Sequence, residues 1–177
     1  MNISLLIVSQ VIGLIAWGLL VYSYYKEDIN KVLFTQIISA VFYCISYLLL
    51  GAWSGLLVCF FELVKAIGYF KSDKDKLIFF VTLPIYVGIA YFTYDGFVSI
   101  LPTIASIIVG FSFTYDKRIA LIGTIFSSIL WIAYDIQIYA FAQALTDGIL
   151  VVSNLFILIN GSTSILKDKD NKIKTRK

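Results

Sequence analysis

Histidine is absent from this chain of 177 residues, and the only two cysteines, Cys44 and Cys59, both lie inside apolar runs. Without histidine, His-ligated metal sites and histidine general bases are excluded. Two cysteines in apolar segments also argue against a disulfide framework. We therefore expect no cofactor and no catalytic centre of the common types.

Charged residues are scarce as well, at 14% of the chain, whereas 60% of the residues are hydrophobic. A soluble domain carries about one quarter charged residues to cover its surface. The mean hydropathy of +0.90 is typical of a protein that resides in a bilayer. The lipid bilayer is thus the first partner that the sequence predicts.

Long apolar runs separated by short polar stretches predict an all-α polytopic membrane protein. A hydrocarbon core about 30 Å thick needs about 20 helical residues, and seven runs approach this length. No basic residue precedes the first run, so we expect it to stay as a helix rather than to be removed as a signal. The predicted spans are residues 3–25, 32–50, 53–70, 77–94, 97–115, 119–140 and 148–166.

The basic residues support seven spans, because 13 of the 14 fall on one side when successive loops are assigned to alternate sides. By the positive-inside rule this side is cytoplasmic. We predict an outer N-terminus and a cytoplasmic C-terminus in a bacterial inner membrane. The net charge of +3 then reflects topology and indicates no nucleic acid partner. These residues are Lys26, Lys31, Lys71, Lys74, Lys76, Lys117, Arg118, Lys167, Lys169, Lys172, Lys174, Arg176 and Lys177.

A weak internal repeat relates the first three predicted spans to the last three. Both triplets start outside, so the fourth span acts as an inverting linker between parallel bundles, a 3+1+3 plan. The predicted parts are a bundle over 3–70, a linker over 77–94, a second bundle over 97–166 and a basic tail over 167–177. Matches at an offset of 93 include Gly55 with Gly148, and at an offset of 88 they include Ser39 with Ser127 and Tyr43 opposite Trp131.

Polar side chains inside the spans are the candidate site residues, because each is costly in lipid unless it is paired or hydrated. Glu62 and Lys65 lie three residues apart on one helix face, where they either pair structurally or contact a solute. Asn154 lies at a similar depth in the seventh span and serves either as an interhelical clamp or as a ligand. Asp135 either faces water at the outer interface or belongs to the site.

Three further residues complete the candidate set. Trp131 lies near the centre of the sixth span, which is too deep for an interface anchor. Tyr43 occupies the corresponding position in the second span, and Gln10 lies near the outer end of the first. Two prolines bear on helix shape: Pro84 should bend the fourth span, and Pro102 lies in the first turns of the fifth.

Five segments together resemble the bacterial inner-membrane YgjV family over residues 9–160. They read "SQVIGLIAW", "LLGAW...ELVKAI", "LPTIASIIV", "WIAYD" and "DGILVVSN". The family's third helix carries Asn, then two residues, then a basic residue, and these positions fall on Glu62 and Lys65. Its sixth-helix Trp, the following polar residue and its seventh-helix Asn fall on Trp131, Asp135 and Asn154. Glutamate in place of asparagine departs from the family pattern.

More distantly, the 3+1+3 plan resembles the superfamily of SWEET sugar carriers, PQ-loop proteins and PnuC-type transporters. That resemblance implies a central site built by an Asn from each triplet and an aromatic residue from each middle helix. The corresponding positions here are Glu62, Asn154, Tyr43 and Trp131. The hinge prolines of those carriers fall on Pro102 and Ser9, so only one of the two is present.

Two function classes follow from these observations. The first is a carrier of a small polar or aromatic solute, working by alternating access without ATP, since no P-loop motif is present. The second is a nontransporting membrane protein, a sensor or assembly partner in which the buried polar groups only stabilise the bundle. An enzyme acting on lipid is a weaker third, because no nucleophile or metal partner is evident. Whether the chain also binds a second copy of itself is left open.

Overall fold

The structure is a computed structural model that describes residues 3–24, 29–71, 75–115 and 117–160. These residues form helices and connecting turns and contain no β-strand, which confirms the predicted all-α class. The basic tail expected over 167–177 lies outside the described residues. The elements are α1 (Ile3–Tyr24), α2 (Ile29–Leu50), α3 (Trp53–Lys71), α4 (Asp75–Phe92), η1 (Phe97–Ile100), α5 (Leu101–Ser112), α6 (Lys117–Gln137) and α7 (Phe141–Asn160).

Three of the helices, α1, α6 and α7, are each long and apolar enough to cross a membrane. Shorter apolar stretches occupy α2, α4 and the η1–α5 segment. Large apolar side chains cover much of the outer surface: on α4, Phe80, Tyr91 and Phe92 are 64%, 79% and 85% exposed. Such a surface is suited to lipid rather than to water, so the chain is built as an integral membrane protein.

The seventh and fifth predicted spans differ from the structure in ways that bear on the site. α7 begins at Phe141, so the stretch 141–147 is helical and the prediction of an outer loop there was wrong. Its polar residues made it resemble a loop, but Gln143 and Thr146 are buried inside the bundle. The fifth span starts as a short 3-10 helix, and Pro102 follows in the first turn of α5, where a missing N–H costs nothing.

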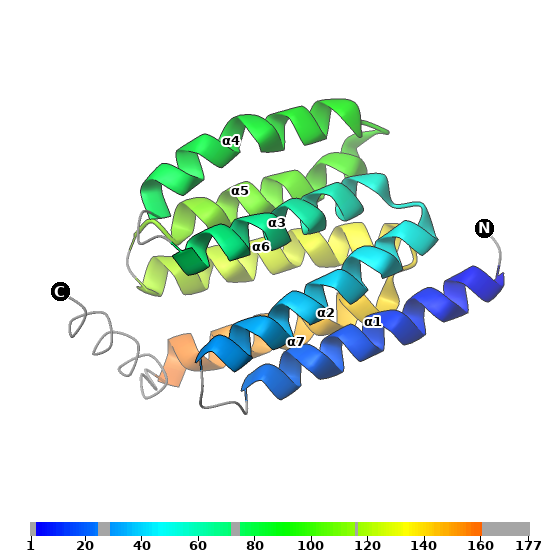
Figure 1. The fold of residues 1–177 in the computed structure, drawn as a ribbon, viewed down its shortest axis with the longest axis horizontal. Coiled ribbons are helices and arrows are strands. Elements are labelled where there is room, and N and C mark those ends of the chain that lie inside the picture. Colours follow the sequence, from blue (N-terminus) through cyan, green and yellow to red (C-terminus); the bar gives the residue numbers. More distant parts are fainter. Residues whose placement is uncertain (1–2, 25–28, 72–74, 116, 161–177) are drawn as a thin grey trace.

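The helices run alternately in opposite directions, so α1 begins and α7 ends at opposite ends of the bundle (Figure 1). Successive packing contacts join α1 to α2, α2 to α3, α3 to α5, α5 to α6, α6 to α7, and α7 back to α1. These contacts close a ring of six helices. α4 packs outside that ring, against α3 and α5 (Figure 1).

Small hydroxyl side chains allow the ring helices to approach closely. The buried Ser39 hydroxyl of α2 donates to the Ala16 carbonyl of α1 at 2.6 Å. Nearer one end of the same interface, the Ser46 hydroxyl of α2 donates to the Ser9 carbonyl of α1 at 2.9 Å. Because lipid cannot satisfy these groups, each interhelical hydrogen bond contributes to holding α2 against α1.

The turns from α2 to α3 and from α6 to α7 have matching geometry. Gly51 (φ 68°) and Tyr139 (φ 62°) each occupy the left-handed region just after a helix. In the first turn the Ala52 N–H donates to the Tyr47 carbonyl at 3.0 Å, and in the second the Ala140 N–H donates to the Asp135 carbonyl at 2.8 Å. Each residue of the second turn lies 88 positions after its counterpart.

Substitution at the two left-handed positions should change stability in opposite directions. Gly51→Ala should lower the free energy of unfolding by about 1 kcal/mol, because a β-carbon disfavours positive φ. Tyr139→Gly should raise it by up to about 1 kcal/mol, since it removes the same strain at the matching position. Both are measured by SDS titration in mixed micelles. Equal midpoints for Gly51→Ala and the unaltered protein would contradict the assignment of strain.

Candidate functional site

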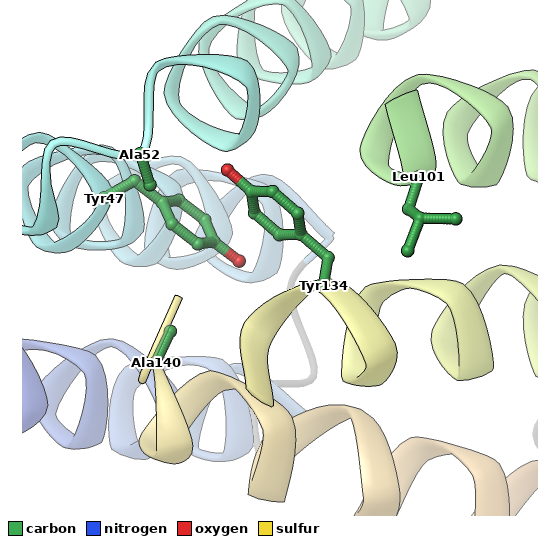
Figure 2. Close-up of a cluster of buried hydrophobic side chains, with 5 residues drawn as sticks. All are labelled: Tyr47, Ala52, Leu101, Tyr134 and Ala140. Carbon is green, nitrogen blue, oxygen red and sulfur yellow. The ribbon is translucent and has the colours of Figure 1, made fainter. Parts of the chain in front are cut away.

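A buried aromatic cluster closes the ring at the end where the two matching turns lie. Tyr47 of α2 and Tyr134 of α6 meet there, with ring centroids 6.3 Å apart (Figure 2). The Tyr134 hydroxyl accepts hydrogen bonds from the Gly55 N–H and the Ser54 hydroxyl, each at 2.9 Å. Position 55 must be glycine for this approach, because a β-carbon would stand 2.8 Å from the Tyr134 ring. The aromatic cluster is therefore closely packed.

Beside this aromatic cluster lies a cavity of about 190 Å³, inside the ring of helices. Side chains from α1, α2, α3, α6 and α7 line it. The lining combines apolar and aromatic surface with a small set of polar groups, which is the usual composition of a small-molecule site. The polar and aromatic lining residues are Tyr43, Tyr47, Cys59, Glu62, Trp131, Gln143, Thr146 and Asp147.

The aromatic wall of the cavity comes from the two middle helices of the predicted triplets. The rings of Tyr47 and Trp131 lie 5.9 Å apart and are inclined by 30°. Tyr43, one turn from Tyr47, donates from its hydroxyl to the Thr146 hydroxyl at 3.3 Å. Tyr43 and Trp131, both expected in the site from the sequence, thus meet at one cavity, and Tyr47 joins them.

Glu62 lines the cavity, and its carboxylate is bound by Lys65 on the same helix. The Lys65 ammonium lies 2.6 Å from one Glu62 oxygen and donates to the other at 2.7 Å. It also donates to the Tyr86 hydroxyl of α4 at 2.8 Å, and that hydroxyl in turn donates to Glu62. Only 6% of the Lys65 side chain is exposed, against 32% for Glu62. The Lys65 side chain is thus buried between Glu62 and Tyr86 and does not line the cavity, whereas Glu62 does.

Tyr86 was not foreseen from the sequence, because a tyrosine in an otherwise apolar span gives no signal by itself. It is fully buried on α4, and its ring lies 5.2 Å from the Lys65 ammonium. Its ring also makes a T-shaped contact with the ring of Phe61 on α3, with the two centroids 5.1 Å apart. Through these contacts the peripheral α4 is attached to the helix that carries Glu62.

Asp135 and Gln10 have structural positions next to the cavity. Asp135 is fully buried, so the alternative that it faces water is wrong; one oxygen accepts from the Tyr47 hydroxyl at 2.9 Å. Gln10 binds the α6–α7 turn with both ends of its amide. Its nitrogen donates to the Tyr139 carbonyl at 2.8 Å, and its oxygen accepts from the Ala142 N–H at 2.9 Å.

Asn154 does not line the cavity; on α7 that role falls to residues nearer the turn. Gln143, Thr146 and Asp147 project into the interior there, and Asn154 is two helical turns further on. Thr146 and Asp147 follow Gln143 by three and four residues, spacings that place each of them on the same helix face as Gln143. This periodicity is the sequence signal for them, and it is hidden when the stretch is assigned to a loop.

Among the described residues no group of three or more Cys, Asp or Glu side chains is arranged to hold a metal ion. The cavity instead presents two carboxyl groups, a carboxamide, hydroxyls and aromatic rings. Such a set can bind a small organic solute by hydrogen bonds, charge and ring contacts, and no nucleophile with an adjacent base is evident in it.

Fold and site together define an all-helical integral membrane protein with a lipid-facing apolar surface and an interior cavity whose mainly apolar and aromatic lining carries a few polar groups. The chain belongs to the Imp-YgjV family, described as bacterial inner membrane protein, because the model of that family matches residues 7–163. This confirms the family resemblance noted from the sequence and places the protein in the inner membrane. No curated protein and no solved structure matches the chain.

The exposures of Glu62 and Lys65 predict unequal effects of their substitution. Glu62→Gln should lower the free energy of unfolding by about 3 kcal/mol, because it leaves a buried ammonium without a carboxylate. Lys65→Met should cost less, since Glu62 can be hydrated from the cavity. The double variant should recover most of the loss. SDS unfolding of all four proteins completes the cycle, and additive losses would show that the ion pair is not the stabilising contact.

Proposed function

We propose that the protein is a carrier of small solutes whose binding site is the central cavity. The observation that carries this proposal is the origin of the lining: α1, α2 and α3 of the first half and α6 and α7 of the second half all contribute side chains. A site shared between two halves changes shape when the halves move relative to each other. Alternating access needs this property.

The 3+1+3 plan is part of the proposal, with α1–α3 and α5–α7 as parallel bundles and α4 as the linker. It is supported by the matching turns, whose residues are 88 positions apart. It is supported as well by the hydrogen bond between Tyr47 and Asp135, which are separated by the same interval. Two equivalent residues touch only at a symmetry axis, so a pseudo-twofold axis would pass through this contact.

The offset of 88 also relates the cavity-lining residues of α3 to those of α7, the third helices of the two proposed bundles. At 88 positions, Cys59 corresponds to Asp147 and Glu62 to Leu150, and all four residues line the cavity. The offset of 93 inferred from the sequence instead set Gly55 against Gly148 and brought Asn154 near the depth of Glu62. We therefore assign the polar group that the second bundle contributes at this depth to Asp147 rather than to Asn154.

The two junctions between the proposed bundles are α3 with α5 and α7 with α1. Rocking at these junctions would open the cavity alternately to either side, while α4 follows α3 through Tyr86 and Lys65. The distribution of basic residues supports an outer N-terminus and a cytoplasmic C-terminus. With no P-loop motif in the sequence, transport would be facilitated or ion-coupled.

Access to the cavity from both sides of the membrane tests this function. In a background with both native cysteines replaced by serine, Thr146→Cys should react with an impermeant thiol reagent in right-side-out and in inverted vesicles. The matched control on the same helix is Val152→Cys, whose side chain is 67% exposed on the outer surface and should stay in lipid, unreactive. Modification of Thr146→Cys from one side only, or from neither, would favour the nontransporting bundle.

A further inference from the structure

The charges around the cavity are unbalanced. Two carboxyl groups line it, those of Glu62 and Asp147, and the lining contains no lysine or arginine. Lys65 compensates Glu62, whereas Asp147 makes no ion pair with a lysine or arginine among the described residues. Asp135, directly behind Tyr47, has only that tyrosine hydroxyl as a partner among the described residues. A carboxyl group buried in a membrane without a cationic partner is unfavourable in its charged form, so it either holds a proton or is stabilised by a positively charged occupant.

Two buried acceptor atoms beside the cavity also lack hydrogen-bond partners. The Gln143 side chain lines the cavity and is 2% exposed; its amide nitrogen donates to Ser46, but its oxygen Oε1 has no partner in the described structure. The second is the oxygen Oδ2 of Asp135. An unsatisfied buried acceptor destabilises the protein, because its hydrogen bonds to water are lost without replacement. A ligand that relieves it must be a hydrogen-bond donor.

The remaining wall is aromatic, from Tyr43, Tyr47 and Trp131. The faces of tyrosine and tryptophan rings attract cations, most strongly where water is excluded. Rings and carboxylates together favour an organic cation over an anion. A divalent metal ion is commonly held by several acidic side chains, and no group of three or more Cys, Asp or Glu that could hold one occurs among the described residues.

We propose that the solute is a small organic cation bearing an ammonium group. Its charge lies against Asp147 and Glu62, its N–H groups reach the free acceptor of Gln143, and its body rests on the rings of Tyr47 and Trp131. The cavity of about 190 Å³ restricts it to a molecule with few non-hydrogen atoms. This inference rests on the proposed carrier function, and it names the class of substrate that the carrier's site would bind.

Cys59 lines the cavity and provides a native reporter of its charge preference. In a Cys44→Ser protein purified in detergent, the modification rate of Cys59 is measured with three methanethiosulfonates of similar size. One carries a trimethylammonium group, one a sulfonate and one is neutral, and each rate is divided by that with a free thiol in solution. The cationic reagent should react at least about tenfold faster than the anionic one.

Two variants assign this preference to the cavity. Asp147→Asn should lower the ratio of cationic to anionic rates several-fold. Asp95→Asn makes the same chemical change in an exposed turn and should leave the ratio unaltered. Where Asp147→Asn does not fold, the ratio in the Cys44→Ser protein itself carries the test, because that protein has an unchanged acidic lining.

The outcomes separate this inference from the carrier proposal. Equal rates for all three reagents, or a faster anionic reagent, would overturn the organic cation while leaving an accessible cavity and a carrier. Failure of even the neutral reagent to reach Cys59 would overturn both, because a closed cavity cannot bind a solute. An equal fall in the ratio for Asp147→Asn and Asp95→Asn would show that the preference arises from general surface charge, and would also overturn the assignment.

Discussion

Every polar side chain placed in the bilayer must find its partner inside the protein, since lipid offers none. This constraint explains why the interior is rich in hydroxyl groups and why the outer surface is apolar. Ser39 and Ser46 donate to backbone carbonyls of α1, and Gln10 binds the α6–α7 turn. The fold is thus held by many short polar contacts between helices rather than by an apolar core of the soluble type.

The same constraint makes the exceptions informative. Three buried side-chain atoms lack hydrogen-bond partners in the described part of the chain: that of Gln143 lines the cavity, that of Asp135 lies behind Tyr47, and that of Thr103 lies on α5. Well-packed apolar residues of similar volume would stabilise a bundle equally well or better. Two of the three lie at or beside the cavity that Asp147 also lines, and this concentration supports the proposal of a binding site there.

The contact of Lys65 with Glu62 and Tyr86 connects the cavity to the periphery. Lys65 is buried, so its position depends on both partners, one facing the cavity and one on α4. A change in the charge around Glu62 would therefore alter the contact of Lys65 with Tyr86, and with it the packing of α4 on α3. The peripheral helix is attached by a polar contact, and the exposed residues Phe80, Tyr91 and Phe92 show that its other side faces outward.

The sequence by itself determined the membrane class, the helical fold, the approximate helix positions and the family, because these depend on apolar run length and on motifs along the chain. It also pointed to three residues that line the cavity: Glu62 as an ionisable residue within a span, Trp131 by its depth, and Tyr43 by its position opposite Trp131 in the repeat. Only the tertiary structure decided which polar residues meet. Asp147 and Gln143 were taken for a loop, Tyr86 gave no signal, and Asn154 was expected at the depth of Glu62. Helix register relative to neighbouring helices sets these meetings, and a shift of five residues between two repeat offsets moves a side chain by more than one turn.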